Sequence, residues 1–306
     1  MSWPRVSVGC GNFGGIGSAP AFFGRGQDEE EAAAIMDAAW AHGLRWFDTA
    51  DAYGGGRSES YIGRWRAARR PEGLLVTTKV FNPVTGDPGD RGLRAERIRR
   101  QVEGSLERLG VARIDLYLAH EPDPETPVAE TVAAFERLVA EGLIGAWGLS
   151  NVGAHELEQA LRHGRPALVQ NGFSLLERAD EEDVLPLCRR HGIAYVAFSP
   201  LAGGWLAGRY ARGAPFPAGS RMTMRPGPYE HLVSARVFDG LDRLAAEAAE
   251  RGTDMATLAF AWVLASPGVA AAVCGPSRPA HLDPVVRALA LPLAPEEHER
   301  IGSFFT

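Results

Sequence analysis

Cysteine is scarce in this chain, whose 306 residues include only Cys10, Cys188 and Cys274. Three widely separated cysteines without a Cys-x-x-Cys pair argue against a disulfide framework and against a zinc site. No cluster of histidine, cysteine and acidic residues suggests another metal, so we expect no metal cofactor. A reducing, cytoplasmic location follows from the same pattern.

Long apolar segments and long basic runs are also missing. No apolar run approaches the roughly 20 residues that a membrane-spanning helix requires. The first residues, MSWPRVSVG, lack the charged and then apolar layout of a signal peptide. The formal net charge of -6 disfavours binding to nucleic acid or to an anionic membrane surface.

What the chain does contain is an alternation of short apolar runs and longer helical patterns, which is typical of a parallel α/β domain. Strands are predicted over residues 5–11, 45–50, 74–80, 114–120, 144–150, 167–171, 194–200 and 269–275. Eight strands, each leading into a helix, indicate a (β/α)8 TIM barrel rather than an open sheet. No linker divides the sequence, so we expect a single domain over residues 1–306.

Helix signals support this interpretation. Asp28 is the expected N-cap of the first helix, and Thr126 followed by Pro127 is expected to open the third. Helical patterns cover residues 28–43, 98–110, 126–142, 154–163, 180–191, 232–251, 255–265, 279–289 and 295–304, and the glycines at 54–56 precede a further helix. The stretch 202–229 carries no helical pattern, and such a long connection in a compact domain usually has a function.

Polar side chains stand where the predicted strands end. Asp48, Lys79 and His120 end the second, third and fourth strands, and Tyr53 follows Asp48 by five residues. The later strands end at Ser150 and Asn151, Gln170 and Asn171, Ser199 and Pro200, and Gly275. Because the carboxyl ends of barrel strands meet at one rim, we expect these groups to converge there.

A glycine pattern near the N-terminus suggests a different fold at first sight. Residues 9–14 read GCGNFG and match G-x-G-x-x-G after a strand. A Rossmann fingerprint should run directly into a helix, with an acidic residue about 20 positions later. Here Gly15, Gly17 and Pro20 follow instead. We therefore reject a Rossmann fold.

Several longer strings resemble the aldo-keto reductase family. They are FDTADAYGGGRSE, TTKV, DLYLAHEPDP, WGLSN, ALVQN, FSPLAGGWLAGRY and CGPSR, in the family's order, from near residue 9 to near residue 285. The resemblance implies an NAD(P)(H)-dependent enzyme that interconverts carbonyl and alcohol substrates on a (β/α)8 barrel. It also implies a catalytic tetrad of Asp48, Tyr53, Lys79 and His120, with Tyr53 as general acid and base.

The chemistry of these four groups supports that assignment. A free phenol has a pKa near 10, and a neighbouring cation should lower it by favouring the phenolate. Lys79 would supply the cation, and Asp48 would keep Lys79 charged. His120 would hydrogen-bond the substrate oxygen and orient it.

The resemblance also implies a set of cofactor-binding residues. Besides Asp48, they are Gly11, Asn12, Phe13, Ser150, Asn151, Gln170, Phe198, Ser199, Pro200, Leu201, Ala202, Gly203, Gly204, Arg209, Ser220, Arg221, Gly275, Ser277, Arg278 and His281. The stretch 202–229 is expected to cover the cofactor. NADP(H) is favoured over NAD(H), because Ser277 and Arg278 suit a 2′-phosphate. Pro284 and Val285 replace a Glu-Asn pair that holds adenine in many members.

The expected substrate pocket combines catalytic and aromatic side chains. It consists of Phe13, Phe22, Phe23, Tyr53, Phe81, His120 and Glu121. Plainer roles stay open for several residues: core or lid packing for Phe22, Phe23 and Phe81, a solvated charge for Glu121, Arg209 and Arg221, and a helix cap for Asn151.

Three other functions remain as alternatives. The first is a cofactor-sensing regulatory subunit on the same fold, and the second is an NAD-dependent sugar dehydrogenase. The third is a lyase in which Lys79 forms a Schiff base, which requires a neutral lysine. The sequence leaves the natural substrate, the direction of reaction and the oligomeric state open.

Overall fold

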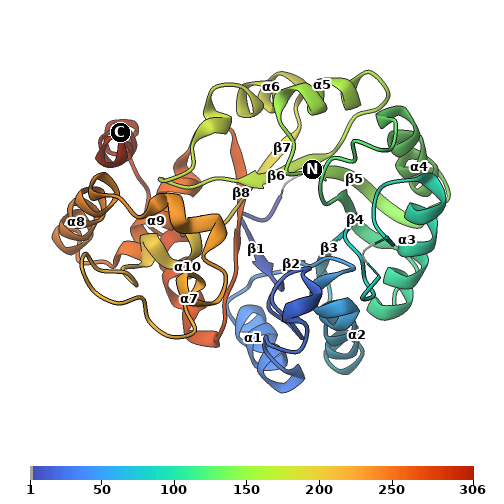
Figure 1. Ribbon diagram of the computed structural model, residues 1–306, viewed down its shortest axis with the longest axis horizontal. Helices are drawn as coiled ribbons and strands as arrows, with labels where there is room; N and C mark the ends of the chain where they lie inside the picture. The colour runs from blue at the N-terminus through green and yellow to red at the C-terminus, as the bar shows by residue number, and fades with distance from the viewer. Residues whose placement is uncertain (1–2, 88) are drawn as a thin grey trace.

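Eight parallel strands close into a barrel in the order in which they occur in the chain. A computed structural model describes residues 3–87 and 89–306. The strands are β1 (Val6–Gly9), β2 (Trp46–Asp48), β3 (Leu75–Val80), β4 (Ile114–Ala119), β5 (Ile144–Ser150), β6 (Leu168–Gly172), β7 (Ala194–Phe198) and β8 (Val269–Cys274). Each pairs with the next, and β1 pairs with β8 (Figure 1). The predicted (β/α)8 barrel is therefore confirmed.

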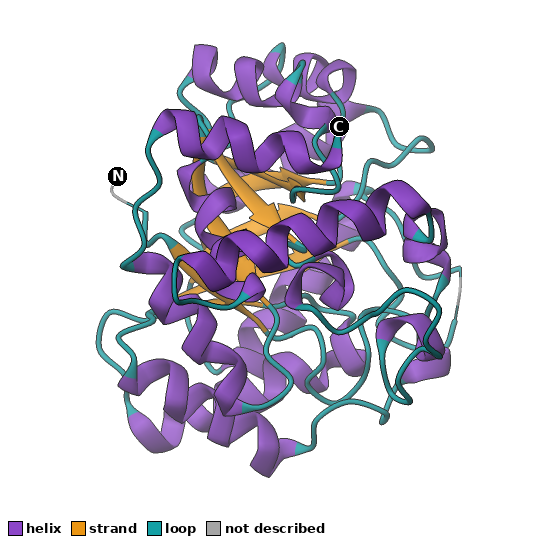
Figure 2. Ribbon diagram, turned by 90° about the vertical axis from the view of Figure 1, so that its left-hand side faces the viewer, coloured by secondary structure: helices purple, strands orange, loops and turns teal. Residues whose placement is uncertain are grey.

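Helices surround the barrel on all sides (Figures 1 and 2). They are α1 (Glu29–Ala41), α2 (Arg57–Arg69), α3 (Ala95–Leu109), α4 (Val128–Ala140), α5 (Ala154–Leu161), α6 (Val184–His191), α7 (Arg221–Met224), α8 (Ala235–Glu250), α9 (Met255–Ala265), α10 (Asp283–Leu289) and α11 (Pro295–Gly302). Several are one to four residues shorter than predicted, because their first or last turn is a 3-10 helix or an irregular turn.

Helix starts follow local hydrogen bonding. Asp28 caps α1 as predicted: its carboxylate accepts from the Glu31 backbone N–H at 2.9 Å, and Glu31 accepts from the Asp28 N–H at 3.0 Å. The prediction that Thr126 caps the third helix is wrong. Its hydroxyl donates to Asp123 Oδ2 at 2.7 Å, and α4 begins two residues later. Asp123 holds Thr126 in a turn, which leaves Pro127 as the cap.

The strands separate two layers of buried side chains. The barrel interior is filled by Trp46, Leu116, Leu118, Leu168, Val196, Ala271 and Val273. Their neighbours along the strands, such as Phe47 and Tyr117, point outward and pack under the helices. This alternation follows from the two-residue period of a strand. Polar residues just beyond the strands are thereby placed at the mouth of the barrel.

The long connection after β7 contains short helices, so the prediction of a helix-free stretch is wrong. It includes the 3-10 helices η4 (Ala202–Ala207) and η5 (Gly227–Leu232), and the single-turn α7. Its anchor is Trp205, which is fully buried and lies 4.9 Å from Tyr210 and 5.5 Å from Phe238 between ring centroids. Such short helices leave too little periodicity to be read from sequence.

Candidate active site

A buried ion pair lies at the mouth of the barrel, at the ends of β2 and β3. The Lys79 ammonium donates to Asp48 Oδ1 and to the Thr49 carbonyl at 2.9 Å. The two side chains are only 1% and 4% exposed. Burial alone would lower the pKa of Lys79, but the Asp48 carboxylate and Tyr53 raise it above its ordinary value. Lys79 is therefore charged.

Gln170 completes the hydrogen bonding of this carboxylate. Its Nε2 donates to Asp48 Oδ2 at 2.7 Å. Because Lys79 occupies the other oxygen, a cation on one side and an amide on the other fix the Asp48 side chain. This contact is not apparent from the sequence, since Gln170 lies 122 residues from Asp48. Strand pairing across the barrel brings the two together.

Tyr53 lies directly above the ion pair, in the 3-10 helix η2 (Tyr53–Gly56) that follows β2. The centroid of its ring lies 5.4 Å from Lys79 Nζ, and its hydroxyl lies 3.5 Å from His120 Nε2. Tyr53 thus lies close to both Lys79 and His120. Gly11 leaves room beside the phenol, since a Cβ there would be 3.5 Å from the Tyr53 ring.

The expectation that Lys79 lowers the pKa of Tyr53 below that of a free phenol is wrong for this structure. Burial raises the pKa of Tyr53 above its ordinary value of 10.0, and the Lys79 charge offsets only part of that rise. A phenolate is costly where burial removes much of its contact with water. The phenol is therefore neutral at physiological pH, which suits a proton donor.

His120 is also neutral. Burial, and then the Lys79 charge, lower the pKa of His120 to about 3. Its Nδ1 has no hydrogen-bond partner within the described chain. Its backbone carbonyl accepts from Asn151 Nδ2 at 2.9 Å, which ties the end of β4 to the end of β5. A neutral imidazole can donate one hydrogen bond to an oxygen bound between it and Tyr53.

The turns after β5 and β7 hold an unusual backbone. Asn151, Ser199 and Ala202 have φ angles of 56°, 55° and 45°, and they are three of the four described non-glycine residues with positive φ. Such strain is concentrated at functional sites.

Asn151 does not cap the next helix, because Gly153 is the N-cap of α5. Ser150 pairs with Gln170 in the sheet, so these two predicted cofactor-binding residues lie at one rim.

Basic side chains gather after β8, near the connection that follows β7. Burial lowers the pKa of His281, and the charges of Arg278 and Arg209 lower it further. Ser277 lies against the same imidazole, with its hydroxyl 3.2 Å from Nδ1. Arg209 and Arg278 are both exposed, as a phosphate-binding pair would be. Val285 is buried in the core at 2% exposure and offers no surface to an adenine.

A hydrogen bond joins the long connection after β7 to the turn after β1. Arg221 donates to Asn12 Oδ1 at 2.8 Å, so Arg221 is not the solvated surface charge left open by the sequence. The neighbouring Ser220 is fully buried and lies 3.4 Å from the Thr223 hydroxyl. The predicted phosphate contacts of Arg221 and Ser220 would compete with these bonds.

Only some of the residues predicted to line the substrate pocket have exposed surface that a substrate could contact. Phe13 and Phe81 are 0% and 2% exposed and pack in the core. Both expectations are therefore corrected, because a fully covered ring offers no surface to a substrate. Phe22 and Phe23 are half-buried. Glu121 is also half-buried, and accepts from Asn82 Nδ2 at 3.3 Å.

The glycines after Tyr53 are required by geometry. Gly54, Gly55 and Gly56 have φ angles of 60°, 68° and 87°, which favour glycine. Arg57 then donates to the Gly54 carbonyl at 2.6 Å. This bond fixes the turn that presents Tyr53. These glycines therefore have a defined structural role in the turn.

The sequence analysis missed a buried polar cluster behind Tyr53. Asp51 is fully buried, and both of its carboxylate oxygens lack a partner among the described residues, as does the Tyr117 hydroxyl. Nearby Glu59 accepts from Arg108 Nε at 2.7 Å. Burial, and then the Glu59 charge, raise the pKa of Asp51 well above its ordinary value. The only sequence signal was a second acidic residue, Asp51, between Asp48 and Tyr53.

Within residues 3–87 and 89–306, no group of three or more His, Cys, Asp or Glu side chains is arranged to hold a metal ion. In the same ranges, no helix is both long and apolar enough to cross a membrane.

Comparison with known sequences identifies the family. The sequence pattern of the Aldo/keto reductase family matches residues 7–305. The chain belongs to the aldo/keto reductase family. This is a family of oxidoreductases that use nicotinamide cofactors, so the resemblance predicted from the sequence is confirmed.

Relatives of this aldo/keto reductase carry several names. It is 37% identical to the uncharacterized oxidoreductase YrpG of Bacillus subtilis, with 92% of this chain and 89% of that protein covered. It is 33% identical to the NADH-specific methylglyoxal reductase of Escherichia coli, covering 91% and 88%. A glycerol dehydrogenase from Gluconobacter oxydans has a similar structure, with a TM-score of 0.85, 27% identity, and 99% and 92% coverage.

The buried Asp51 generates a prediction about stability. Its folded-state pKa lies above the unfolded value of about 3.9, so stability falls as the pH rises from that value toward the folded pKa. Asp51→Asn removes this loss. We expect the variant to match wild type near pH 4 and to be more stable at pH 8 by about 1–3 kcal/mol.

Urea denaturation at pH 5, 6.5 and 8 measures this difference. Asp242→Asn is the matched control, because that side chain is 80% exposed. An advantage of Asp51→Asn that does not grow with pH would contradict the burial of an ionisable carboxyl.

Proposed function

We propose that this aldo/keto reductase is an NADP(H)-dependent enzyme that reduces an aldehyde or ketone to an alcohol. One observation carries the proposal. A neutral phenol lies beside a neutral imidazole and above a buried, charged lysine. This arrangement supplies a proton donor, a hydrogen-bond donor and a fixed positive charge to one substrate oxygen.

Each member of the proposed tetrad has a distinct task. Tyr53 donates its proton to the carbonyl oxygen, and the Lys79 charge stabilises the phenolate that remains. Asp48 keeps Lys79 charged and in place. His120 hydrogen-bonds the carbonyl oxygen from the other side and orients it. A dihydronicotinamide, when bound, would supply the hydride for the carbonyl carbon.

The cofactor contacts are proposed from the surrounding residues. Ser150, Asn151 and Gln170 are suited to the nicotinamide amide, although Asn151 and Gln170 already donate to His120 and Asp48. The stretch 202–229 is proposed to cover the pyrophosphate. Arg278, with Arg209 and His281 nearby, favours the extra phosphate of NADP(H). The NADH-specific relative keeps NAD(H) as the alternative.

Other functions compete with this proposal. Relatives in Arabidopsis thaliana and Oryza sativa are described as probable voltage-gated potassium channel β subunits, which favours a regulatory role as a second candidate. The glycerol dehydrogenase neighbour favours oxidation of a polyol or sugar. A Schiff-base lyase is disfavoured, because the pKa of Lys79 is raised and such chemistry needs a neutral amine.

Tyr53→Phe tests the proton donor. The variant keeps the ring but loses the hydroxyl, so we expect kcat for NADPH-dependent carbonyl reduction to fall at least about a hundredfold. NADPH binding, measured by fluorescence titration, should change by less than about threefold. Tyr61→Phe on α2 is the control. Full activity in Tyr53→Phe would rule out the assigned role.

The pH dependence of reduction tests both neutral groups. Because the pKa of Tyr53 is raised and that of His120 is lowered to about 3, neither should titrate near neutrality. We expect kcat for reduction to be flat from about pH 5 to about pH 9. Alcohol oxidation needs the phenolate and should rise across the same range. A break in reduction near pH 6.5 would contradict the neutral His120.

Arg278→Ala tests cofactor choice. Loss of the guanidinium should raise KM for NADPH by about tenfold while KM for NADH changes by less than about twofold. Arg287→Ala is the control, because Arg287 pairs with Asp254 on the outer helices. Equal changes in KM for NADPH and NADH would show that Arg278 does not bind the 2′-phosphate.

A further inference from the structure

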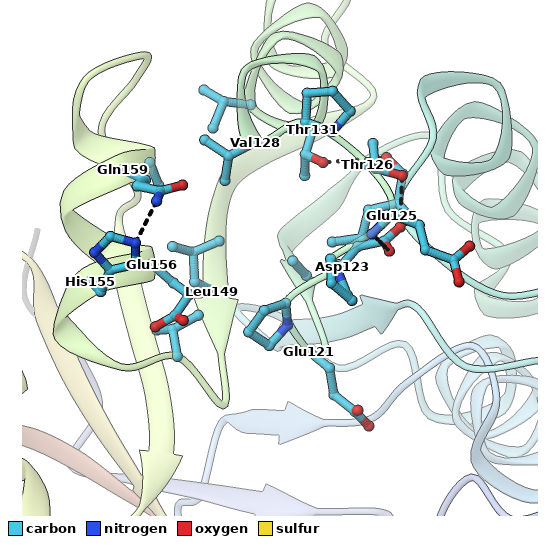
Figure 3. Close-up of a pocket in the computed structure, with 18 residues that line it drawn as sticks. Glu121, Asp123, Glu125, Thr126, Val128, Thr131, Leu149, His155, Glu156 and Gln159 are labelled. Atoms are coloured by element: carbon cyan, nitrogen blue, oxygen red, sulfur yellow. Dashed lines mark hydrogen bonds between the residues drawn. The ribbon is translucent and has the colours of Figure 1, made fainter.

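A cavity of about 480 Å³ lies outside the barrel, between α4 and α5 (Figure 3). Its walls are the first turns of α4, the inner face of α5 and the loop of residues 121–127 that joins β4 to α4. A volume of this size is typical of small-molecule sites. In Figure 3, His155 and Gln159 line one side, and Thr126 and Thr131 line the other.

The strands separate this cavity from the candidate active site. Ala119 on β4 and Leu149 on β5 line the cavity and belong to the core outside the barrel. Leu118, one residue earlier on β4, faces the barrel interior. The residues that follow Ala119 and Leu149 are His120 and Ser150, which belong to the candidate active site at the mouth of the barrel. The cavity therefore uses the opposite face of two strands that also hold proposed catalytic and cofactor contacts.

The cavity combines an apolar floor with acidic side chains. The apolar lining is Leu93, Ala119, Val128, Val132, Leu149, Val152 and Ala160. Four carboxylates belong to the same lining: Glu121, Asp123, Glu125 and Glu156. Among the described residues, no lysine or arginine lines it. The histidine of the lining, His155, is exposed and contacts Gln159 at 2.6 Å.

Two of these carboxylates are fixed in position without a cationic partner. Asp123 accepts from the Leu93 and Glu125 backbone N–H groups and from Thr126, at 2.7, 3.0 and 2.7 Å. Burial alone would raise the pKa of Asp123, but these hydrogen bonds hold it below its ordinary value. Glu156 accepts from the Gly153 N–H at 3.1 Å through Oε2, which leaves its other oxygen free.

None of the four carboxylates forms an ion pair with a lysine or arginine in the part of the chain that the structure describes. Glu121 turns its carboxylate away from the other labelled side chains in Figure 3. The negative charge at the cavity itself therefore comes chiefly from Asp123 and Glu156. An apolar recess lined by fixed carboxylates and by no lysine or arginine disfavours anions and favours cations, although the nearby Arg91 charge offsets part of the charge of Asp123.

We propose that this cavity binds an organic ammonium ion with an apolar body. The ammonium group lies beside Glu156 and Asp123, and the hydrocarbon lies against Val128, Leu149 and Val152. A metal ion is a poorer occupant, because it would leave the apolar floor uncovered. The proposal is independent of carbonyl reduction, since it concerns a different face of the barrel.

Calorimetry with matched probes tests the charge preference. Hexylammonium, hexanol and hexanoate share one hydrocarbon chain and differ in charge. We expect hexylammonium to bind to the protein without cofactor or substrate, at least about tenfold more tightly than hexanol. Hexanoate should show no binding. Equal affinity for hexylammonium and hexanol, or no binding of hexylammonium, would overturn the proposal.

Two variants test the location. Glu156→Gln keeps an acceptor for the Gly153 N–H but removes the charge, and should weaken hexylammonium binding about fivefold. Glu158→Gln, an exposed change on the same helix outside the cavity, should have no effect. Val128→Trp fills the cavity and should abolish binding. If that variant does not fold, Gln159→Trp replaces it, with circular dichroism as the folding check.

Unchanged affinity in Glu156→Gln and in the folded cavity-filling variant would place the ligand elsewhere and overturn the proposal. Because calorimetry measures hexylammonium binding without turnover, its result does not depend on the activity of the Tyr53→Phe variant. An inactive Tyr53→Phe enzyme and a failed ammonium titration are therefore separate outcomes.

Discussion

The ion pair between Asp48 and Lys79 is the interaction on which the candidate site depends. A charged pair this deeply buried is costly unless its remaining hydrogen-bonding positions are filled. The Thr49 carbonyl and Gln170 fill them, from β2 and from the far side of the barrel. The pair fixes a positive charge beneath Tyr53, and burial of the same region keeps both Tyr53 and His120 neutral. Burial is therefore the main cause of the neutral state of Tyr53 and His120, and the Lys79 charge opposes it at Tyr53 and reinforces it at His120.

The turn that carries Tyr53 is held from two sides. Toward the barrel, the Asp51 backbone N–H donates to the Lys79 carbonyl at 3.0 Å. Toward the helices, Arg57 donates a hydrogen bond to the Gly54 carbonyl and fixes the glycine turn. Asp51 is buried on the same side, and neither of its carboxylate oxygens has a hydrogen-bond partner among the described residues. An unpartnered buried carboxyl costs stability. Its position two residues from Tyr53 fits the view that strained or unsatisfied groups persist near functional sites.

Much of the fold was predictable because its signals are local. Each strand is a short, largely apolar run, and Asp28 with Glu31 marks the start of α1 through neighbouring backbone groups. The errors also have local causes. Thr126 has the residue type of a helix cap, but a nearby acceptor, Asp123, binds its hydroxyl instead. The helices after β7 were missed because they are only a few residues long and contain glycine and proline.

The sequence alone determined the eight-strand barrel, and it also predicted that Asp48, Tyr53, Lys79 and His120 meet at one rim, since strand ends converge in any such barrel. Only the tertiary structure decided how these groups are paired and protonated. The Gln170 bond to Asp48, the burial that outweighs Lys79 at Tyr53, and the cavity behind β4 and β5 all depend on residues far apart in the chain. Burial and through-space charge are properties of the packed molecule, so no local pattern encodes them.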